Sequence, residues 1–194
     1  DGIRDSVASR GLGDVYKRQL SGVDLSSKDL TGTKLIGADL SQTNLADADL
    51  SNSILTDVDL SGKDLTGTIL TGADLSFANL TDVNLSDKDL TGTILKGVDL
   101  SGKDLSNTIL INANLENATL ENAKMLDANL DGANLTNADL RNILLVDANL
   151  SNATLKGADL TNGILTGAIL TDANLENAIL TNAIMNCIDH PVCV

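Results

Sequence analysis

The sequence predicts an all-β solenoid, a stack of similar coils built from a five-residue unit, and two registers of residues support this prediction. From Leu20 to Met185 every fifth residue is large and apolar: of 34 such positions, 32 are Leu and two are Met. Two residues before them, the 33 positions from Val23 to Ala183 hold 17 Ala, with Val, Thr and a few others. No insertion or deletion interrupts the count. Such a period is typical of repeat architectures and determines the whole fold.

A period of five fits neither an α-helix, which needs apolar spacings of three, four and seven, nor an alternating strand. The second residue after each Leu is Gly, Asn or Asp in 30 of 33 units, the exceptions being Ser27, Gln42 and Phe77. Gly, Asn and Asp tolerate left-handed or tight-turn backbone. We therefore expect each unit to form one short extended side and one corner. The Leu and the small residue two positions before it should face inward.

The unit Ala-(Asp/Asn)-Leu-(Ser/Thr)-(Gly/Asn/Asp) resembles the repeat of the pentapeptide-repeat family, and the resemblance covers about 85% of the chain. It implies a right-handed parallel quadrilateral β-helix with four units to a coil. Each coil would then contain 20 residues, which gives about eight coils. With neighbouring strands ~4.8 Å apart, the rod would be roughly 40 Å long.

The repeat divides the chain into three parts. Residues 1–19 share neither its period nor its composition, and the stretch from Gly11 to Gln19 resembles an adapter-derived sequence, so we expect a non-native or disordered leader. Residues 20–185 form the predicted β-helix. Residues 186–194 break the period and are expected to be either a C-terminal cap or a truncated end. A cap would cover the unpaired strand edges with which a β-helix ends.

Composition argues against several classes of function. The chain has a formal net charge of −14, which disfavours direct binding to nucleic acid or to an anionic membrane surface. It contains one His, one Tyr and no Trp, and a straight rod offers no concave site where catalytic groups could converge. No apolar run is long enough to span a bilayer. We expect neither enzyme activity nor a cofactor, and the sequence specifies no cellular compartment.

Four lysines occupy the inward register in the first half of the repeat: Lys28, Lys63, Lys88 and Lys103. An ammonium group inside an apolar column costs several kcal/mol unless it is paired. We expect each stem to fill the column while the head reaches solvent or carbonyl groups near a corner. A binding role for the four lysines is the alternative.

The outward positions before each Leu become apolar toward the C-terminus. Folding the sequence at 20 residues places Leu144, Ile164 and Ile184 in one column, with Ile169 and Ile179 on neighbouring faces. An exposed apolar patch often marks an interface. We expect these five residues to form a contact surface for a homodimer or a covering cap. Harmless exposed side chains on an aliphatic ladder are the alternative.

Cys187, His190 and Cys193 lie within seven residues near the C-terminus. They could be a disulfide pair that caps the last coil, a pair of free thiols, or three ligands of an incomplete zinc site. A disulfide would require an oxidising compartment. The spacing alone does not decide among the three.

The simplest functional interpretation is a non-catalytic scaffold or protein-interaction module whose partner is unknown. The resemblance implies an alternative, because some pentapeptide-repeat proteins mimic B-form DNA and bind type II topoisomerases such as gyrase. Duplex DNA carries about one charge per 1.7 Å of axis. The 23 acidic residues at 20–188 match that density before the nine basic residues are subtracted. A surface array for ice or minerals is less favoured, because Ile36, Lys96 and Glu116 interrupt the Ser/Thr columns.

Overall fold

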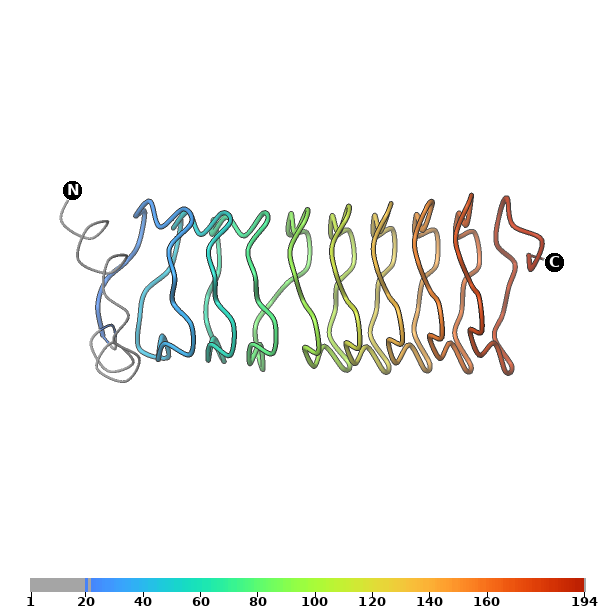
Figure 1. Cartoon of the computed structure of the whole chain (residues 1–194), viewed down its shortest axis with the longest axis horizontal. Coiled ribbons are helices and arrows are strands. Elements are labelled where there is room, and N and C mark those ends of the chain that lie inside the picture. The colour runs from blue at the N-terminus through green and yellow to red at the C-terminus, as the bar shows by residue number, and fades with distance from the viewer. Residues whose placement is uncertain (1–19, 21, 194) are drawn as a thin grey trace.

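A computed structural model describes residue 20 and residues 22–193, and the chain forms a rod of stacked coils (Figure 1). The leader expected at 1–19 lies outside the described residues. Within the described part there is no helix, and every extended segment is a single bridge residue. The bridges are parallel, and up to Ile184 each joins a residue to the one 20 positions later, from Asp24↔Asn44 to Ile164↔Ile184. This pairing has the 20-residue period that we expected for one coil.

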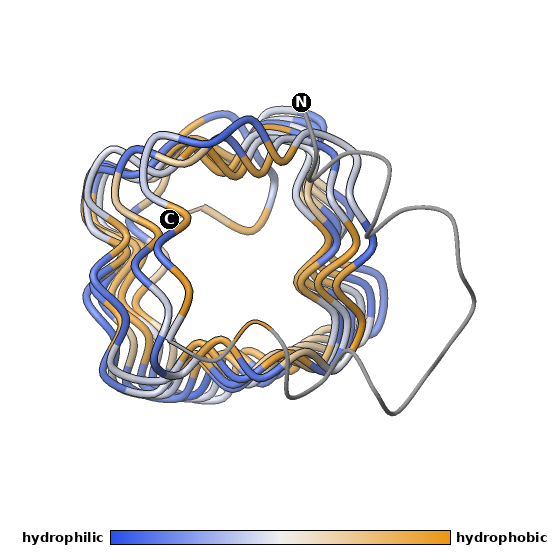
Figure 2. Cartoon of the chain, turned by 90° about the vertical axis from the view of Figure 1, so that its left-hand side faces the viewer, coloured by the Kyte–Doolittle hydropathy of each residue, from blue (hydrophilic) through white to orange (hydrophobic). Residues whose placement is uncertain are grey.

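The coil is four-sided, as the view along the rod shows (Figure 2). We number the sides in chain order by their bridge residues. Side 1 carries residue 24 and every twentieth residue to 184, and side 2 carries residue 29 and every twentieth to 169. Side 3 runs in the same way from 34 to 174, and side 4 from 39 to 179. Sides 1 and 3 therefore lie opposite each other.

The inward leucines form the core. From Leu25 to Leu170 every Leu or Met of the register is at most 5% exposed, and the alanines between them are nearly as well buried. Complete burial of one such side chain contributes about 1.5–3 kcal/mol. In the last coil Leu175 and Leu180 are only partly buried, because no further coil stacks on them. The predicted inward registers are confirmed along the shaft.

The corners form where the sequence placed Gly, Asn and Asp. From Gly22 to Asn182 the second residue after each Leu has a positive φ, and Gln42 is the exception. Even Phe77 adopts φ 57°, a value unusual for a bulky side chain. Its ring lies against the next coil, where a Cβ added to Gly97 would be 2.4 Å from Phe77 Cε1. Gly97 therefore leaves room for the ring, and a larger residue at this corner would require the exposed ring of Phe77 to shift.

At many corners the side chain of the Asp or Asn before a Leu accepts a hydrogen bond from the backbone N–H of the residue after that Leu. Asp49 Oδ1 accepts from the backbone N–H of Ser51 at 2.9 Å and from Ser51 Oγ at 2.5 Å. Asp99 and Ser101 form the same pair at 2.9 and 2.6 Å. These bonds lower the pKa of both carboxyl groups, the side-chain hydrogen bond being the larger cause. Many of the regularly spaced Asp residues thus stabilise the turns, a role that their spacing alone did not predict.

The ladders are not equally continuous. Side 3 keeps every bridge from Lys34 to Asn174. Side 1 has no bridge at three successive junctions, 44/64, 64/84 and 84/104, although all these residues are described. Sides 2 and 4 each lack one bridge in the described repeat, at 69/89 and 79/99. All the interruptions lie in the N-terminal half of the rod.

Candidate interaction surfaces

The inward lysines lie where the ladder is interrupted. Lys63 Nζ donates to the carbonyl of Thr43 at 2.8 Å, and Lys103 Nζ donates to the carbonyl of Val83 at 3.2 Å. Lys88 Nζ donates to the carbonyl of Leu65. These three side chains are partly buried, whereas Lys28 in the first described coil is exposed. The expected placement, stem in the column and head on a carbonyl, therefore holds for three of the four.

Burial lowers the pKa of Lys63 and of Lys88, because the charged ammonium loses hydration. Nearby carboxylates act in the opposite direction: Asp39 and Asp59 on Lys63, and Asp64 on Lys88. Desolvation is the larger effect in both cases. The partly buried surroundings of Lys63 and of Lys88 therefore disfavour the charged form of each side chain.

Two surface cavities open on side 1 between the separated coils. One, of about 540 Å³, is lined by residues 81–84, Asp99 and residues 101–104, with Lys103 among them. The other, of about 440 Å³, is lined mainly by residues 62–67 and by Asn84 and Lys88. Both are lined by polar and charged groups of mixed sign. Neither contains a His or Cys that could act as base or nucleophile.

The predicted apolar residues come together at the C-terminal end of the rod. Leu144, Ile164 and Ile184 are consecutive partners in the side 1 ladder. Ile169 lies on side 2 and pairs with Ile188, a residue that the period of five did not reveal because it follows the last unit. The exposed fractions are 46% for Ile184, 37% for Ile169 and 47% for Ile188.

Ile179 lies on side 4 and is 49% exposed, while Leu144 and Ile164 are half-buried. The structure therefore places three of the five predicted residues in one column and one on each neighbouring side. We call the column Leu144, Ile164 and Ile184, together with Ile169 and Ile188 beside it, the apolar stripe.

Charged side chains of opposite sign stack between coils at other corners of the rod. Lys96 pairs with Glu116 at 3.1 Å and Lys156 with Glu176 at 3.0 Å, each one coil away. Arg141 contacts Asp139 at 2.6 Å and Glu121 at 3.0 Å. The hydrogen bond and charge of Asp139 raise the pKa of Arg141, and the same hydrogen bond lowers that of Asp139. Exposed pairs like these contribute little stability, typically ~0–1 kcal/mol each.

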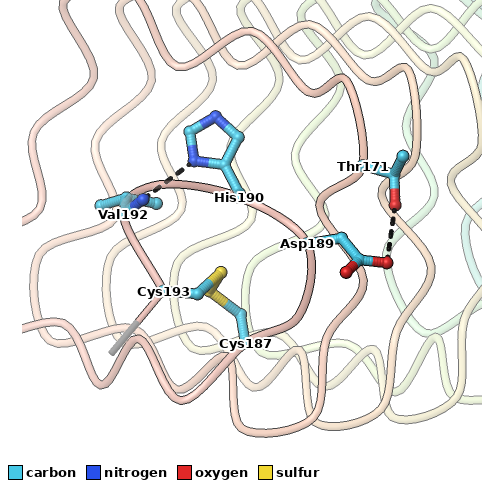
Figure 3. The surroundings of a disulfide bond; sticks show 6 residues. All are labelled: Thr171, Cys187, Asp189, His190, Val192 and Cys193. Atoms are coloured by element: carbon cyan, nitrogen blue, oxygen red, sulfur yellow. Dashed lines mark hydrogen bonds between the residues drawn. A yellow bond between two sulfur atoms is a disulfide. The ribbon is translucent and has the colours of Figure 1, made fainter.

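The segment after the last unit closes into a small loop (Figure 3). Cys187 and Cys193 are joined by a disulfide with a Cα–Cα distance of 4.9 Å, and the backbone N–H of Val192 donates to His190 Nδ1 at 3.2 Å. Cys187, Val192 and Cys193 pack against the core. Both sulfur atoms are thus used in the bond. Within the described residues no group of three His, Cys, Asp or Glu side chains is arranged to hold a metal ion.

None of the described residues belongs to a helix long and apolar enough to cross a bilayer.

The repeat region of the chain is similar to known proteins. The family model described as pentapeptide repeats matches the chain in several segments that together extend from residue 24 to residue 189. A comparison with curated protein sequences gives no match.

Solved structures with the same repeat are also similar. The pentapeptide repeat protein Rfr23 from the cyanobacterium Cyanothece is 42% identical, over 50% of this chain and 67% of its own, with a TM-score of 0.47. HetL from the cyanobacterium Nostoc, a pentapeptide repeat protein involved in heterocyst differentiation regulation, is 30% identical over 89% of this chain and 91% of its own, with a TM-score of 0.33.

QnrB1, a plasmid-mediated fluoroquinolone resistance protein, is 18% identical over 84% of this chain and 89% of its own, with a TM-score of 0.41. The match to the family model covers most of the described repeat, and the HetL alignment extends over nearly the whole of both chains. The chain belongs to the pentapeptide-repeat family.

Proposed function

We propose that this protein is a non-catalytic interaction module: a rod, wound right-handed as its family implies, that binds protein through its outer surface. The observation that carries the proposal is the apolar stripe. Leu144, Ile164 and Ile184 follow one another at a single strand spacing, and Ile169 and Ile188 lie beside them. Contiguous apolar surface of this kind on a soluble domain marks a contact site more often than isolated exposed residues do.

A second copy of the chain is the partner that we propose for the stripe. Its outer residues are aliphatic and lie on a straight ladder, so two stripes can face each other about a two-fold axis with each residue contacting its counterparts. Burial of exposed aliphatic surface supplies about 25 cal/mol per Å². The acidic character of the chain favours an apolar contact here, because carboxylate-rich faces of two copies would repel each other.

Sedimentation velocity tests this proposal. We expect the wild-type chain to sediment as a dimer at micromolar concentration and the Ile164→Asp, Ile184→Asp double variant as a monomer. Ile54→Asp, Ile94→Asp is the matched control, since these residues occupy side 3 in the N-terminal half and are partly exposed. It should remain dimeric. A wild-type monomer, or a dimer that survives the stripe substitutions with its circular dichroism unchanged, would refute the homodimer.

The alternative function, a DNA-mimicking binder of a type II topoisomerase, draws support from a different surface. Side 4 carries an acidic column at one strand spacing, in which Asn79 and Thr119 interrupt the carboxylates Asp39, Asp59, Asp99, Asp139 and Asp159. Asp139 is already paired with Arg141. A supercoiling assay with purified gyrase, with and without a quinolone, separates the two functions. No effect at micromolar protein would remove the alternative and leave the interaction module in place.

A further inference from the structure

The N-terminal half of the rod is held together differently on its two opposite sides. On side 3 the bridges Lys34↔Ile54, Ile54↔Asp74 and Asp74↔Ile94 are all present. On side 1, across the same coils, three successive bridges are missing. Within the described residues, the backbone N–H groups of Asp64, Asn84 and Asp104 donate to no backbone carbonyl. One side of these coils is therefore closed by hydrogen bonds and the opposite side is open.

The side 1 lysines occupy two of the three acceptors that the missing ladder bonds would use. In intact junctions the N–H of a bridge residue donates to the carbonyl 21 positions earlier, as from Ile164 to Ile143 at 2.9 Å. The corresponding acceptor for Asp64 is Thr43, whose carbonyl instead accepts from Lys63 Nζ. For Asp104 it is Val83, whose carbonyl accepts from Lys103 Nζ. Each of these two stems leaves the column between two coils and replaces a backbone bond with its own ammonium.

Solvent can enter on side 1. The backbone hydrogen bonds that hold neighbouring coils in register elsewhere are missing there. The two cavities lie between these same coils and are lined by Lys63, Lys88 and Lys103 together with the unpaired backbone segments. Figure 1 shows a green segment that crosses obliquely between neighbouring coils, whereas the yellow and red coils are evenly spaced. A region with few internal hydrogen bonds and access to water opens at low free-energy cost.

We propose that residues 61–104 are a hinge, at which the rod bends about the continuous ladder of side 3 and opens along side 1. Sides 2 and 4 each lack a single bridge in this region, so they resist bending less than side 3 does. Lys63 and Lys103 keep side 1 open, because each ammonium occupies a carbonyl that a backbone N–H of the ladder would otherwise use. The C-terminal coils, with Ala at most inward small positions and bridges on every side, form the rigid arm.

Distances between paired spin labels, measured by double electron–electron resonance, test the hinge. The first pair, Asn44→Cys with Lys124→Cys, spans the open junctions on side 1. The second, Asp104→Cys with Ile184→Cys, spans the same number of residues on the same side of the rigid arm. The third, Lys34→Cys with Asn114→Cys, spans the hinge region on side 3. The chain has no free cysteine among its described residues, and labelled protein diluted with unlabelled protein suppresses distances between copies.

We expect the distance distribution of the first pair to be about twofold wider than those of the other two pairs, because only the first spans the opening. Equal widths for the first and second pairs would overturn the hinge. A third pair as wide as the first would also overturn it, since side 3 would then not be the axis of bending.

A Lys63→Val, Lys103→Ala variant in the background of the first pair tests whether the two lysines keep side 1 open. Both replacements occur naturally in this column, as Val83 and Ala123. We expect the ladder to close and the width to fall to that of the second pair. A folded variant with undiminished width would show that the lysines do not cause the opening. If the variant fails to fold, the comparison of the three wild-type pairs still decides the hinge itself.

Discussion

The coils up to Asp104 and the coils beyond it have the same leucines and nearly the same corners, but they close differently. In the C-terminal coils the inward small register is Ala at all positions except Thr108, Ile143 and Gly163, and every side is bridged. In the N-terminal coils the same register holds Lys, Thr, Val and Ser as well as Ala, and five bridges are missing. The leucines and corners thus define the coil, and the small register decides whether neighbouring coils pair completely.

Polarity alone does not explain the difference. Thr33, Thr93 and Thr108 are buried in the same register, and each donates its hydroxyl to the carbonyl three residues earlier at 2.7 Å. A hydroxyl is short enough to be satisfied within its own unit. A lysine side chain is too long to be satisfied in this way. Its ammonium group therefore leaves the column between two coils. The length of the polar side chain therefore separates these threonines from Lys63 and Lys103.

The largest difference between the halves should appear when core leucines are truncated. Leu65 and Leu145 occupy the same column, and both are almost fully buried. We expect Leu145→Ala to lower the free energy of unfolding by about 3 kcal/mol and Leu65→Ala by about 2 kcal/mol, because the open coils near Leu65 can relax around the lost volume. Urea unfolding measures both. Equal losses would show that the open side 1 does not loosen the core beneath it.

A lysine placed in the closed half should reproduce the open half. Ala123 is fully buried and follows Lys103 in its column, and the bridges on both sides of its coil are intact. We expect Ala123→Lys to destabilise the rod by about 2 kcal/mol and to break the bridges at Lys124, since the new ammonium would be desolvated. Ala123→Thr is the matched control, with a smaller loss. If Ala123→Lys were as stable as Ala123→Thr, chain length in this register would not be the cause.

The inward lysines also predict a pH dependence confined to the N-terminal half. A lysine whose folded-state pKa is lowered binds fewer protons when folded than when unfolded. Stability should therefore rise as pH increases from the folded-state pKa of Lys63 and Lys88 toward their ordinary value of 10.5. Thermal unfolding of wild type and of Lys63→Val, Lys88→Thr between pH 8 and about 10 measures this rise. A rise of the same size in both proteins would contradict the assignment.

Acid should act on both halves alike, and this is the smallest effect. The corner carboxyl groups of Asp49, Asp99 and Asp139 have pKa values below the ordinary 3.8. Their stabilising hydrogen bonds are complete above pH 3.8 and are lost as pH falls through the lower folded-state values. The melting temperature should therefore decline only below about pH 4. A decline that begins near neutral pH would point to other groups.

Much of this structure follows from the sequence because the constraints are local and repeated. The inward Leu and the corner at Gly, Asn or Asp each depend on one unit, so the coil period and the core could be predicted. The broken ladder could not, because it depends on how Lys63 and Lys103 reach carbonyls a whole coil away. The sequence feature that could have indicated the broken ladder is the set of lysines in the inward register. The roles of Asp49 and Ile188 were missed because the period of five describes positions and not hydrogen bonds.

Amide hydrogen exchange, resolved by residue with NMR, tests the difference between the halves most directly. The N–H groups of Leu144, Ile164 and Ile184 donate to carbonyls of the preceding coil at 3.0, 2.9 and 2.8 Å. Those at the matching positions Asp64, Asn84 and Asp104 have no backbone acceptor in the described structure. We expect the second group to exchange at least about tenfold faster than the first, after correction for intrinsic rates. Equal protection at the two sets of positions would contradict an open side 1.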